Sequence, residues 1–280
     1  MQLRELQKHF ETRLLEQYPE EEVTTFFAWL TEAYLGWNRF EASLHKESEI
    51  SEAQQQQFEE ALHRLARFEP IQHILGSTEW MGMELKVNKH TLIPRPETET
   101  LVRWIAEDTK EVPGSILDIG TGSGCIAIAL ARHWPEAAVA AIDVSEAALT
   151  IAATNASSQE VVISFQQLDI LQETSLPAQY DIIVSNPPYV RHSEKARMKP
   201  NVLRYEPASA LYVEDEDPLL FYRKIAQLAI LHLTASGALY FEINEYLGSE
   251  LIQELKTIGF QEVVLRKDLF SKPRMIRCSL

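Results

Sequence analysis

Hydrophobic and polar residues follow two different periods along this chain. Over residues 1–68, apolar side chains recur every three or four positions, as at Leu3, Leu6 and Phe10, which is the spacing of one helix face. From residue 97 onward, short apolar runs alternate with segments of helical period. That alternation is typical of a doubly wound parallel sheet. The pattern therefore predicts a small helical bundle followed by an α/β domain.

The same pattern places the individual elements of the second part. Residues 80–87 alternate enough to suggest a short strand pair between the two parts. We therefore divide the chain into a helical domain over residues 1–75, a linker with the strand pair over residues 76–93, and an α/β domain over residues 94–280. Strands are expected near residues 115–120, 138–143, 161–168, 180–185, 237–243, 260–266 and 274–279. Helices are expected near residues 97–110, 124–134, 145–157, 217–234 and 245–258.

Three glycines at alternate positions follow the first strand expected in the α/β domain. Gly120, Gly122 and Gly124 allow a tight turn, and their backbone N–H groups can approach a ligand closely. The spacing differs from the dinucleotide fingerprint, because Cys125 stands where that motif requires its last glycine, and no P-loop lysine follows. Asp118, just before the glycines, would repel a pyrophosphate. A carboxylate there suits the cationic end of a ligand, such as the amino group of a methionyl moiety.

Two more acids stand at the ends of expected strands. Asp143 and Asp169 end the strands over residues 138–143 and 161–168. In doubly wound folds, the acid about twenty residues after the glycine turn binds ribose hydroxyls. Each acid taken alone could simply cap the next helix or turn. Three acids at the carboxyl ends of three successive strands indicate an adenosine-type cofactor.

A further motif, Asn-Pro-Pro-Tyr, follows the buried strand expected at residues 180–185. Pro187 and Pro188 remove two backbone donors and stiffen the turn, since each fixes φ near about −65°. The loop thus combines the amide of Asn186, uncommitted carbonyls and the ring of Tyr189. These groups suit a planar substrate that bears an NH2 group. The alternative is that the prolines only end the strand.

The motifs together resemble the S-adenosylmethionine-dependent methyltransferases that act on amino groups. Residues 118–125, Asp143 and residues 186–189 carry this resemblance. Asn-Pro-Pro-Tyr is shared by adenine-N6 DNA methyltransferases, some guanine-N2 rRNA methyltransferases and the protein-glutamine methyltransferases of release factors. Three further segments resemble motifs of the last group: residues 70–76, 92–99 and 205–211.

The resemblance implies a fold, a reaction and a set of site residues. The fold is a seven-stranded Rossmann-like sheet with strand order 3-2-1-4-5-7-6, its seventh strand antiparallel, preceded by the helical bundle. The reaction is methyl transfer from S-adenosylmethionine to the side-chain amide nitrogen of the glutamine in the Gly-Gly-Gln motif of class-1 peptide release factors. Cofactor-binding residues are expected to be Asp118, Gly120, Thr121, Gly122, Ser123, Gly124, Asp143, Asp169, Ile170 and Asn186. The catalytic residues would be Asn186, Pro187 and Tyr189, and the substrate would be bound by these together with Pro188, Arg95 and Glu97.

The charge of the chain bears on its partners. The 41 acidic residues outnumber the 26 basic ones, giving a net charge of −15. Proteins that track a phosphate backbone present basic surfaces, so this balance favours a protein substrate over DNA. Residues 1–75 hold 14 acids and 7 bases. The resemblance favours a docking role for this domain, and the alternative is that the bundle only stabilises its neighbour.

Two rival functions remain open from the sequence. An adenine-N6 or other nucleic-acid methyltransferase would use the same loop on a flipped base, but it needs a basic groove. A non-enzymatic nucleotide-binding module would explain the glycines and leave Asn-Pro-Pro-Tyr without a role. No apolar run reaches the ~20 residues of a membrane span, and the start lacks the apolar region of a signal peptide. No His/Cys cluster suggests a metal, so we expect a soluble, cytoplasmic, metal-free enzyme.

Overall fold

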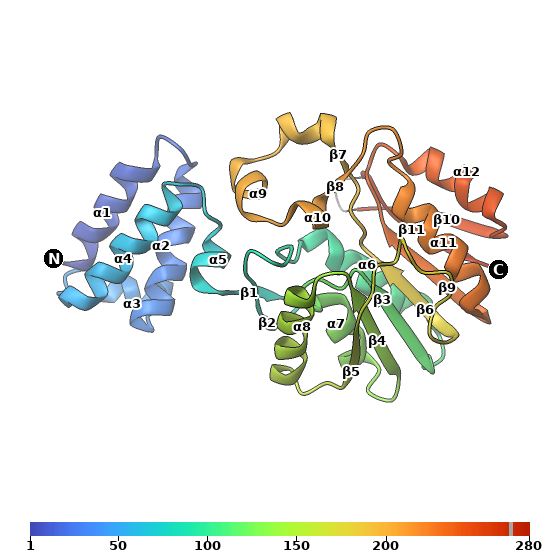
Figure 1. Ribbon diagram of the computed structural model, residues 1–280. Coiled ribbons are helices and arrows are strands. Elements are labelled where there is room, and N and C mark those ends of the chain that lie inside the picture. The colour runs from blue at the N-terminus through green and yellow to red at the C-terminus, as the bar shows by residue number, and fades with distance from the viewer. Residues whose placement is uncertain (269–270) are drawn as a thin grey trace. The chain divides into compact units, whose positions relative to one another are not determined.

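A computed structural model describes residues 1–268 and 271–280 and divides the chain into two units (Figure 1). The helical unit consists of Met1–Gly76 together with Lys199–Tyr205. The sheet unit consists of Ser77–Met198 and Glu206–Leu280. None of the helices in the described ranges is both long and apolar enough to cross a membrane.

The helical unit is built from amphipathic helices, which confirms the predicted helical bundle. At its centre the ring of Phe10 meets those of Phe27 and Phe58 edge-on, with centroids 5.3 and 6.0 Å apart. Asn38 and Ser51 begin two of the helices with capping boxes, which satisfy backbone N–H groups of the first turn. The helices are α1 (Leu3–Leu14), α2 (Glu20–Leu35), α3 (Arg39–Leu44), α4 (Glu52–Leu65) and α5 (Ile71–Leu75).

One short helix from the second half of the chain also belongs to the helical unit. It is α9 (Pro200–Tyr205). The hydroxyl of Tyr205 donates to the carbonyl oxygen of Arg67 at 3.1 Å, and the guanidinium of Arg204 lies 5.4 Å from the ring centre of Phe68. The sequence pattern indicates no such return, since it assigns residues 94–280 to one domain. The difference arises because side chains far apart in the sequence hold this helix in place.

The sheet unit contains a seven-stranded sheet in the predicted order. The strands are β3 (Ser115–Ile119), β4 (Ala138–Asp143), β5 (Ile163–Gln167), β6 (Tyr180–Ser185), β9 (Leu233–Glu242), β10 (Glu262–Lys267) and β11 (Pro273–Ser279). They lie in the order β10-β11-β9-β6-β3-β4-β5, and β11 is antiparallel to both of its neighbours. Numbered along the chain, this order is 3-2-1-4-5-7-6. The expected fold class is confirmed.

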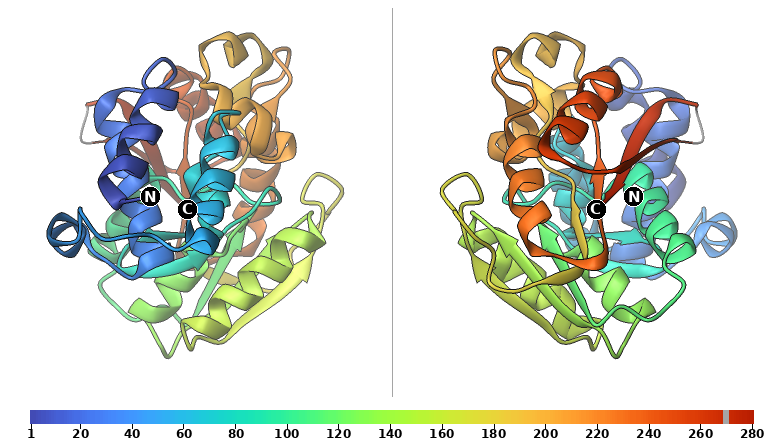
Figure 2. Two further views of the ribbon diagram at one scale, coloured as in Figure 1. Left: turned by 90° about the vertical axis from the view of Figure 1, so that its left-hand side faces the viewer. Right: turned by 90° about the vertical axis from the view of Figure 1, so that its right-hand side faces the viewer.

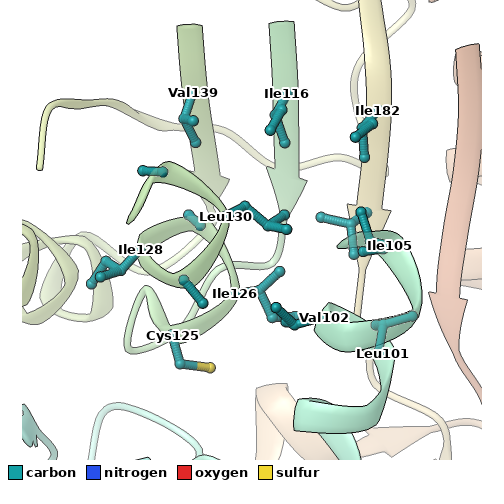
Figure 3. Packing of buried hydrophobic residues seen from close by; sticks show 14 of the residues in the cluster. Leu101, Val102, Ile105, Ile116, Cys125, Ile126, Ile128, Leu130, Val139 and Ile182 are labelled. Atoms are coloured by element: carbon teal, nitrogen blue, oxygen red, sulfur yellow. The ribbon is translucent and has the colours of Figure 1, made fainter. Parts of the chain in front are cut away.

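Helices cover both faces of this sheet (Figure 1; Figure 2). One face is covered by α6 (Pro96–Asp108), α7 (Cys125–His133) and α8 (Glu146–Ser158), and the other by α11 (Leu220–His232) and α12 (Gly248–Ile258). Neighbouring residues of a strand point to opposite faces, so Ile116 joins the first apolar layer and Leu117 the second. Figure 3 shows Ile116, Val139 and Ile182 of three adjacent strands facing the apolar side chains of α6 and α7. Burial on both faces explains why these strands read as continuous apolar runs.

Smaller elements complete the sheet unit. The hairpin of β1 (Ser77–Trp80) and β2 (Met83–Lys86) turns at Met81 and Gly82, which both have positive φ, and it corresponds to the expected strand pair. The segment that follows β6 forms β7 (Val190–Arg191) and the 3-10 helix η1 (His192–Arg197). After α9 come α10 (Ala208–Leu211) and β8 (Tyr212–Val213), which pairs with β7.

Candidate active site

A cavity of about 300 Å³ opens at the carboxyl ends of β3, β4 and β6, within the sheet unit. This is the edge at which open α/β sheets bind ligands. Sequence-predicted residues that line the cavity are Arg95, Gly120, Thr121, Gly122, Ser123, Asp143, Asp169, Ile170, Asn186, Pro187 and Pro188. Asp118, Gly124, Glu97 and Tyr189 do not line it.

The glycine loop owes its shape to three left-handed residues. Gly120, Gly122 and Gly124 have φ values of +75°, +56° and +83°, which side chains other than glycine rarely adopt. Gly124 has a second constraint, because a Cβ there would stand 3.1 Å from the Cβ of Ala152 and from Cδ1 of Ile128. The loop therefore leads directly from β3 into α7, and α8 packs closely against its last glycine.

Asp118 lies beneath the loop and is fully buried. Its Oδ2 accepts a hydrogen bond from the hydroxyl of Thr121 at 2.6 Å, and Thr121 in turn lines the cavity. Its Oδ1 makes no hydrogen bond of ordinary geometry with the described residues. Burial raises the pKa of this carboxyl to about 7, opposed by the Thr121 hydroxyl and the Ala127 N–H. Asp118 thus stands behind the cavity wall, in contact with the lining residue Thr121.

The other two acids face the cavity directly. Asp143 accepts the backbone N–H of Gly122 on one oxygen and that of Ser145 on the other, each at 2.9 Å. Asp169 accepts the N–H of Leu171 at 3.0 Å, on Oδ1. Each carboxylate oxygen can accept a second hydrogen bond. The two acids are therefore both turn-forming residues and available acceptors.

The loop that follows β6 brings Asn186 to the same cavity. The strand end is fixed by Ser185, whose hydroxyl donates to the carbonyl of Ile119 at 2.7 Å. The side-chain Nδ2 of Asn186 lies 3.4 Å from Oγ1 of Thr98 on α6. Pro187 and Pro188 both line the cavity. The rigid proline pair thus holds Asn186 in the wall of the cavity that the glycine loop also lines.

Tyr189 is fixed behind the loop. Its hydroxyl donates to Oε1 of Glu242 at 3.1 Å, and its carbonyl accepts from Nδ2 of Asn244 at 2.9 Å. Burial, and then the charge of Glu242, raise the pKa of this phenol well above its usual range. The hydroxyl therefore stays protonated at any physiological pH, and it anchors the ring.

The two predicted substrate residues near α6 differ in position. Arg95 lines the cavity, and its guanidinium donates to Oε1 of Glu206 at 2.5 Å. The other oxygen of Glu206 accepts the N–H of Ile93 at 3.1 Å. Glu97 does not reach the cavity. The ion pair of Arg95 therefore joins the segment before α6 to the segment before α10.

Sequence reasoning missed three buried polar residues around this site. Glu206 and Thr98 lie inside the segments that carry the family resemblance, and that position is the signal that could have found them. Glu242 stands at the end of an apolar strand, where one acid among buried residues is the only indication. Across the part of the chain that the structure describes, no group of three or more His, Cys, Asp or Glu side chains could hold a metal ion.

Comparisons with known proteins agree with this architecture. Residues 5–76 match the PrmC N-terminal domain, and residues 96–204 match the Methyltransferase small domain. A release factor glutamine methyltransferase of Flavobacterium psychrophilum is 46% identical over 99% of both chains. The chain belongs to the release factor glutamine methyltransferase family. Family members from Bacteroides thetaiotaomicron and Streptococcus pneumoniae are 42% and 40% identical, covering 92% and 99% of this chain and 93% and 98% of their own.

Solved structures of lower identity share the fold of the sheet unit. The hMettl16 catalytic domain superposes with a TM-score of 0.60 at 18% identity, covering 76% of this chain and 83% of its own. A methyltransferase from Pyrococcus furiosus gives 0.53 at 17% identity, covering 71% and 89%. At this identity the likeness concerns the fold alone.

The cofactor of this family is S-adenosylmethionine, and the cavity suits it. Its walls bring together a loop of left-handed glycines, two carboxylates at strand ends and the apolar side chain of Ile170. An amino-acid tail requires backbone N–H groups, a ribose requires acceptors for its hydroxyls, and an adenine requires an apolar surface. The residues present therefore fit this cofactor.

Proposed function

We propose that this chain transfers a methyl group from S-adenosylmethionine to the side-chain amide nitrogen of a glutamine, the one in the Gly-Gly-Gln motif of class-1 release factors. One observation carries the proposal above the others. Asn186 and Pro187 line the same cavity as the glycine loop and Asp143, so an amide held by Asn186 lies next to the cofactor site. The names of the relatives supply the identity of the substrate.

The chemical difficulty is the poor nucleophilicity of an amide nitrogen, whose lone pair is delocalised into the carbonyl. When bound, S-adenosylmethionine supplies an electrophilic methyl group. Oδ1 of Asn186 and the carbonyl of Pro187 are proposed to accept the two N–H hydrogens of the glutamine. These bonds favour a pyramidal nitrogen, aim its lone pair and stabilise the positive charge that develops on it.

The remaining residues of the loop are proposed to define the geometry. Tyr189 does not line the cavity, so it is proposed to support the loop from behind through the bond of its hydroxyl to Glu242, in place of the expected packing of its ring on the amide. Pro188 and Arg95 line the cavity, and both are proposed to contact the substrate, with Arg95 held in place by Glu206. No strong general base is needed, because the proton leaves only after the nitrogen has become acidic.

Substrate choice is proposed to depend on the helical unit. An amide is a small target whose few contacts cannot distinguish one protein from another. The 14 acids and 7 bases of residues 1–75 offer an acidic surface to a basic protein partner. We infer that this unit docks the release factor, and that the enzyme works in the cytoplasm, where translation factors act.

A nucleic-acid substrate remains the second candidate, because adenine-N6 methyltransferases carry the same Asn-Pro-Pro-Tyr loop. The net charge of −15 opposes it, since affinity for a phosphate backbone is mostly electrostatic. The test is to incubate the enzyme and labelled cofactor with release factors and, separately, with DNA. Label on the Gly-Gly-Gln glutamine, mapped by mass spectrometry, supports the proposal, whereas label on DNA alone overturns it.

A further inference from the structure

The reaction as proposed leaves one buried carboxylate of the site without a role. Glu242, the last residue of β9, is 1% exposed. Its Oε2 accepts the hydroxyl of Thr98 at 2.6 Å, and its Oε1 accepts the hydroxyl of Tyr189 at 3.1 Å. A buried acid is costly unless it is well paired. Both partners are joined to the Asn-Pro-Pro-Tyr loop, one through a hydrogen bond and the other as a member of it.

The contact with Thr98 determines how Asn186 is oriented. A threonine hydroxyl has one proton, and at 2.6 Å this proton is committed to Glu242. Thr98 therefore offers only lone pairs to its other neighbour, Asn186, which must present Nδ2 and not Oδ1. The observed Nδ2–Oγ1 distance of 3.4 Å agrees with that direction.

Orientation matters because the two ends of the amide have opposite chemistry. With Nδ2 directed at Thr98, Oδ1 is left for the cavity, and among the groups that the structure describes none donates a hydrogen bond to it. A flipped amide would present N–H donors to the substrate NH2 group, and two donors cannot bond each other. The buried hydrogen bond from Thr98 to Glu242 thus determines whether Asn186 presents an acceptor or a donor to the reacting nitrogen.

We propose that Glu242 is a positioning residue that fixes the amide of Asn186 through Thr98 and the ring of Tyr189 through its hydroxyl. The proposal rests on the proposed function for the role of Asn186, and it adds Thr98 and Glu242 to the residues on which turnover depends. The backbone of Glu242 is itself held, since its carbonyl accepts the hydroxyl of Tyr222 at 3.2 Å.

The arrangement also depends on the charge of Glu242. Burial raises the pKa of this carboxyl, whereas the Thr98 and Tyr189 hydroxyls and the charge of Arg274 lower it. A protonated Glu242 would donate to Thr98, which would free the threonine proton for Oδ1 of Asn186 and reverse the amide. The titratable or charged groups that act on or contact Glu242 from neighbouring elements are Glu97, Cys125, Tyr189, Tyr222 and Arg274.

The first test uses variants of Thr98 in the full-length enzyme with a release factor as substrate. Thr98→Val keeps the shape and removes the hydroxyl, so kcat should fall about 10- to 100-fold, as for a misplaced catalytic group. Thr98→Ser keeps the hydroxyl and should stay within about threefold of the parent, well inside that loss. Cofactor affinity, measured by calorimetry, should be nearly unchanged in both, because Asn186 is misoriented but not displaced.

A second variant separates positioning from stability. Glu242→Gln is isosteric and removes a buried charge, so the thermal midpoint should not fall, yet kcat should drop. In the parent, protonation of Glu242 should lower kcat at acidic pH, and this decline should be absent in Glu242→Gln. The double variant with Thr98→Val should be no slower than the worse single one, because both act on the same amide. A lower thermal midpoint with weaker cofactor binding in Glu242→Gln, or additive losses in kcat, would show a merely structural role.

A measurement on the protein without substrate keeps this inference distinct from the proposed function. In 15N-labelled enzyme, the side-chain NH2 resonance of Asn186, assigned with Asn186→Ala, should shift in Thr98→Val and return in Thr98→Ser. If the resonance does not move, the proposed positioning of Asn186 by Glu242 through Thr98 is wrong, even where the release factor is methylated. If it moves as expected while the parent enzyme methylates no release factor, the positioning role is supported and the substrate assignment fails.

Discussion

The backbone N–H of Gly122 lies 2.9 Å from Oδ2 of Asp143 and donates a hydrogen bond to it. The glycine loop after β3 and the acid at the end of β4 are therefore one structural unit. Gly122 has a left-handed φ, and its N–H is bound by the carboxylate at the end of β4. We therefore expect a change at Asp143 to act on cofactor binding in two ways, through the lost acceptor and through the loosened loop.

Removing the Asp143 carboxylate should weaken S-adenosylmethionine binding. Asp143→Ala should lose about 1.5–3 kcal/mol, the size of a charge-assisted hydrogen bond, and NAD should not bind either protein. Asp143→Asn keeps one oxygen acceptor, so it should lie between the parent and the alanine variant. Calorimetric titration gives the affinities, and equal values in all three proteins would remove Asp143 from the site.

The two glycines Gly122 and Gly124 offer a matched pair of stability tests. Gly124→Ala combines a left-handed conformation with a Cβ 3.1 Å from Ala152, so it should cost roughly 2–4 kcal/mol in the free energy of unfolding. Gly122→Ala has the same backbone strain and open space within 4 Å, so about 1–2 kcal/mol is expected. Denaturant unfolding measures both, and equal losses would mean that close packing against α8 contributes nothing.

Much of the fold is predictable because it depends on local periodicity. The apolar runs buried on both faces locate the central strands, and the glycines and acids locate the carboxyl edge of the sheet. Glycine permits the left-handed backbone conformation that this turn needs, so Gly120, Gly122 and Gly124 predict the turn directly. All three have positive φ. The strand order itself came from the family resemblance and not from periodicity.

What could not be predicted depends on contacts between distant residues. Glu242 binds Thr98 and Tyr189, which are 144 and 53 residues away in the sequence. The pattern of an apolar strand does not predict which side chains its one acid will contact. The place of α9 depends on Tyr205 and Arg67, 138 residues apart. The sequence predicts that the ring of Tyr189 projects from the loop, whereas in the structure its hydroxyl points to the buried carboxylate of Glu242.

Cofactor affinity should depend on pH through Asp118. Its pKa is raised to about 7 by burial, so the carboxyl is largely neutral below that pH and attracts a cationic ligand less. Binding should strengthen as the pH rises from about 6 to 8, by up to about tenfold per unit below the pKa. Asp118→Asn should bind weakly with a flatter profile, which also corrects for titration of the cofactor itself. Superimposable profiles would exclude Asp118 as the titrating group.

The same shift has a consequence for stability. In the unfolded chain this carboxyl titrates at the ordinary 3.8, so between that pH and about 7 the folded state binds more protons than the unfolded state. The contribution of Asp118 to stability therefore declines as the pH rises through this window and then levels off. Without cofactor, Asp118→Asn should be more stable than the parent at pH 8 and similar at pH 4, by thermal unfolding in matched buffers.

Asn186 separates binding from chemistry. Asn186→Ala should keep the fold and most of the cofactor affinity but lose about 10²–10³ in kcat, because its oxygen acts mainly in the transition state. Single-turnover methylation at saturating cofactor measures this, with circular dichroism to confirm folding. Turnover near the parent rate would mean that the Asn-Pro-Pro-Tyr loop serves only to end β6.

The helical unit should determine which protein is methylated. Deleting residues 1–76 leaves every residue that lines the cavity in the chain, so cofactor binding should remain. Methylation of an intact release factor should fall sharply, while a short Gly-Gly-Gln peptide, already a poor substrate, should change much less. Added salt should weaken docking of the full-length enzyme modestly, as for complementary charged surfaces.

This deletion also removes the partners of α9, so a control must separate lost docking from a loosened segment. The double variant Arg204→Ala/Tyr205→Phe in the full-length chain removes the contacts of α9 with Phe68 and Arg67 and keeps residues 1–76. If docking is the cause, this double variant should methylate the release factor at close to the parent rate while the deletion does not. An equal loss in both would assign the effect to α9, and a deleted enzyme that modifies the intact release factor at full rate would refute docking altogether.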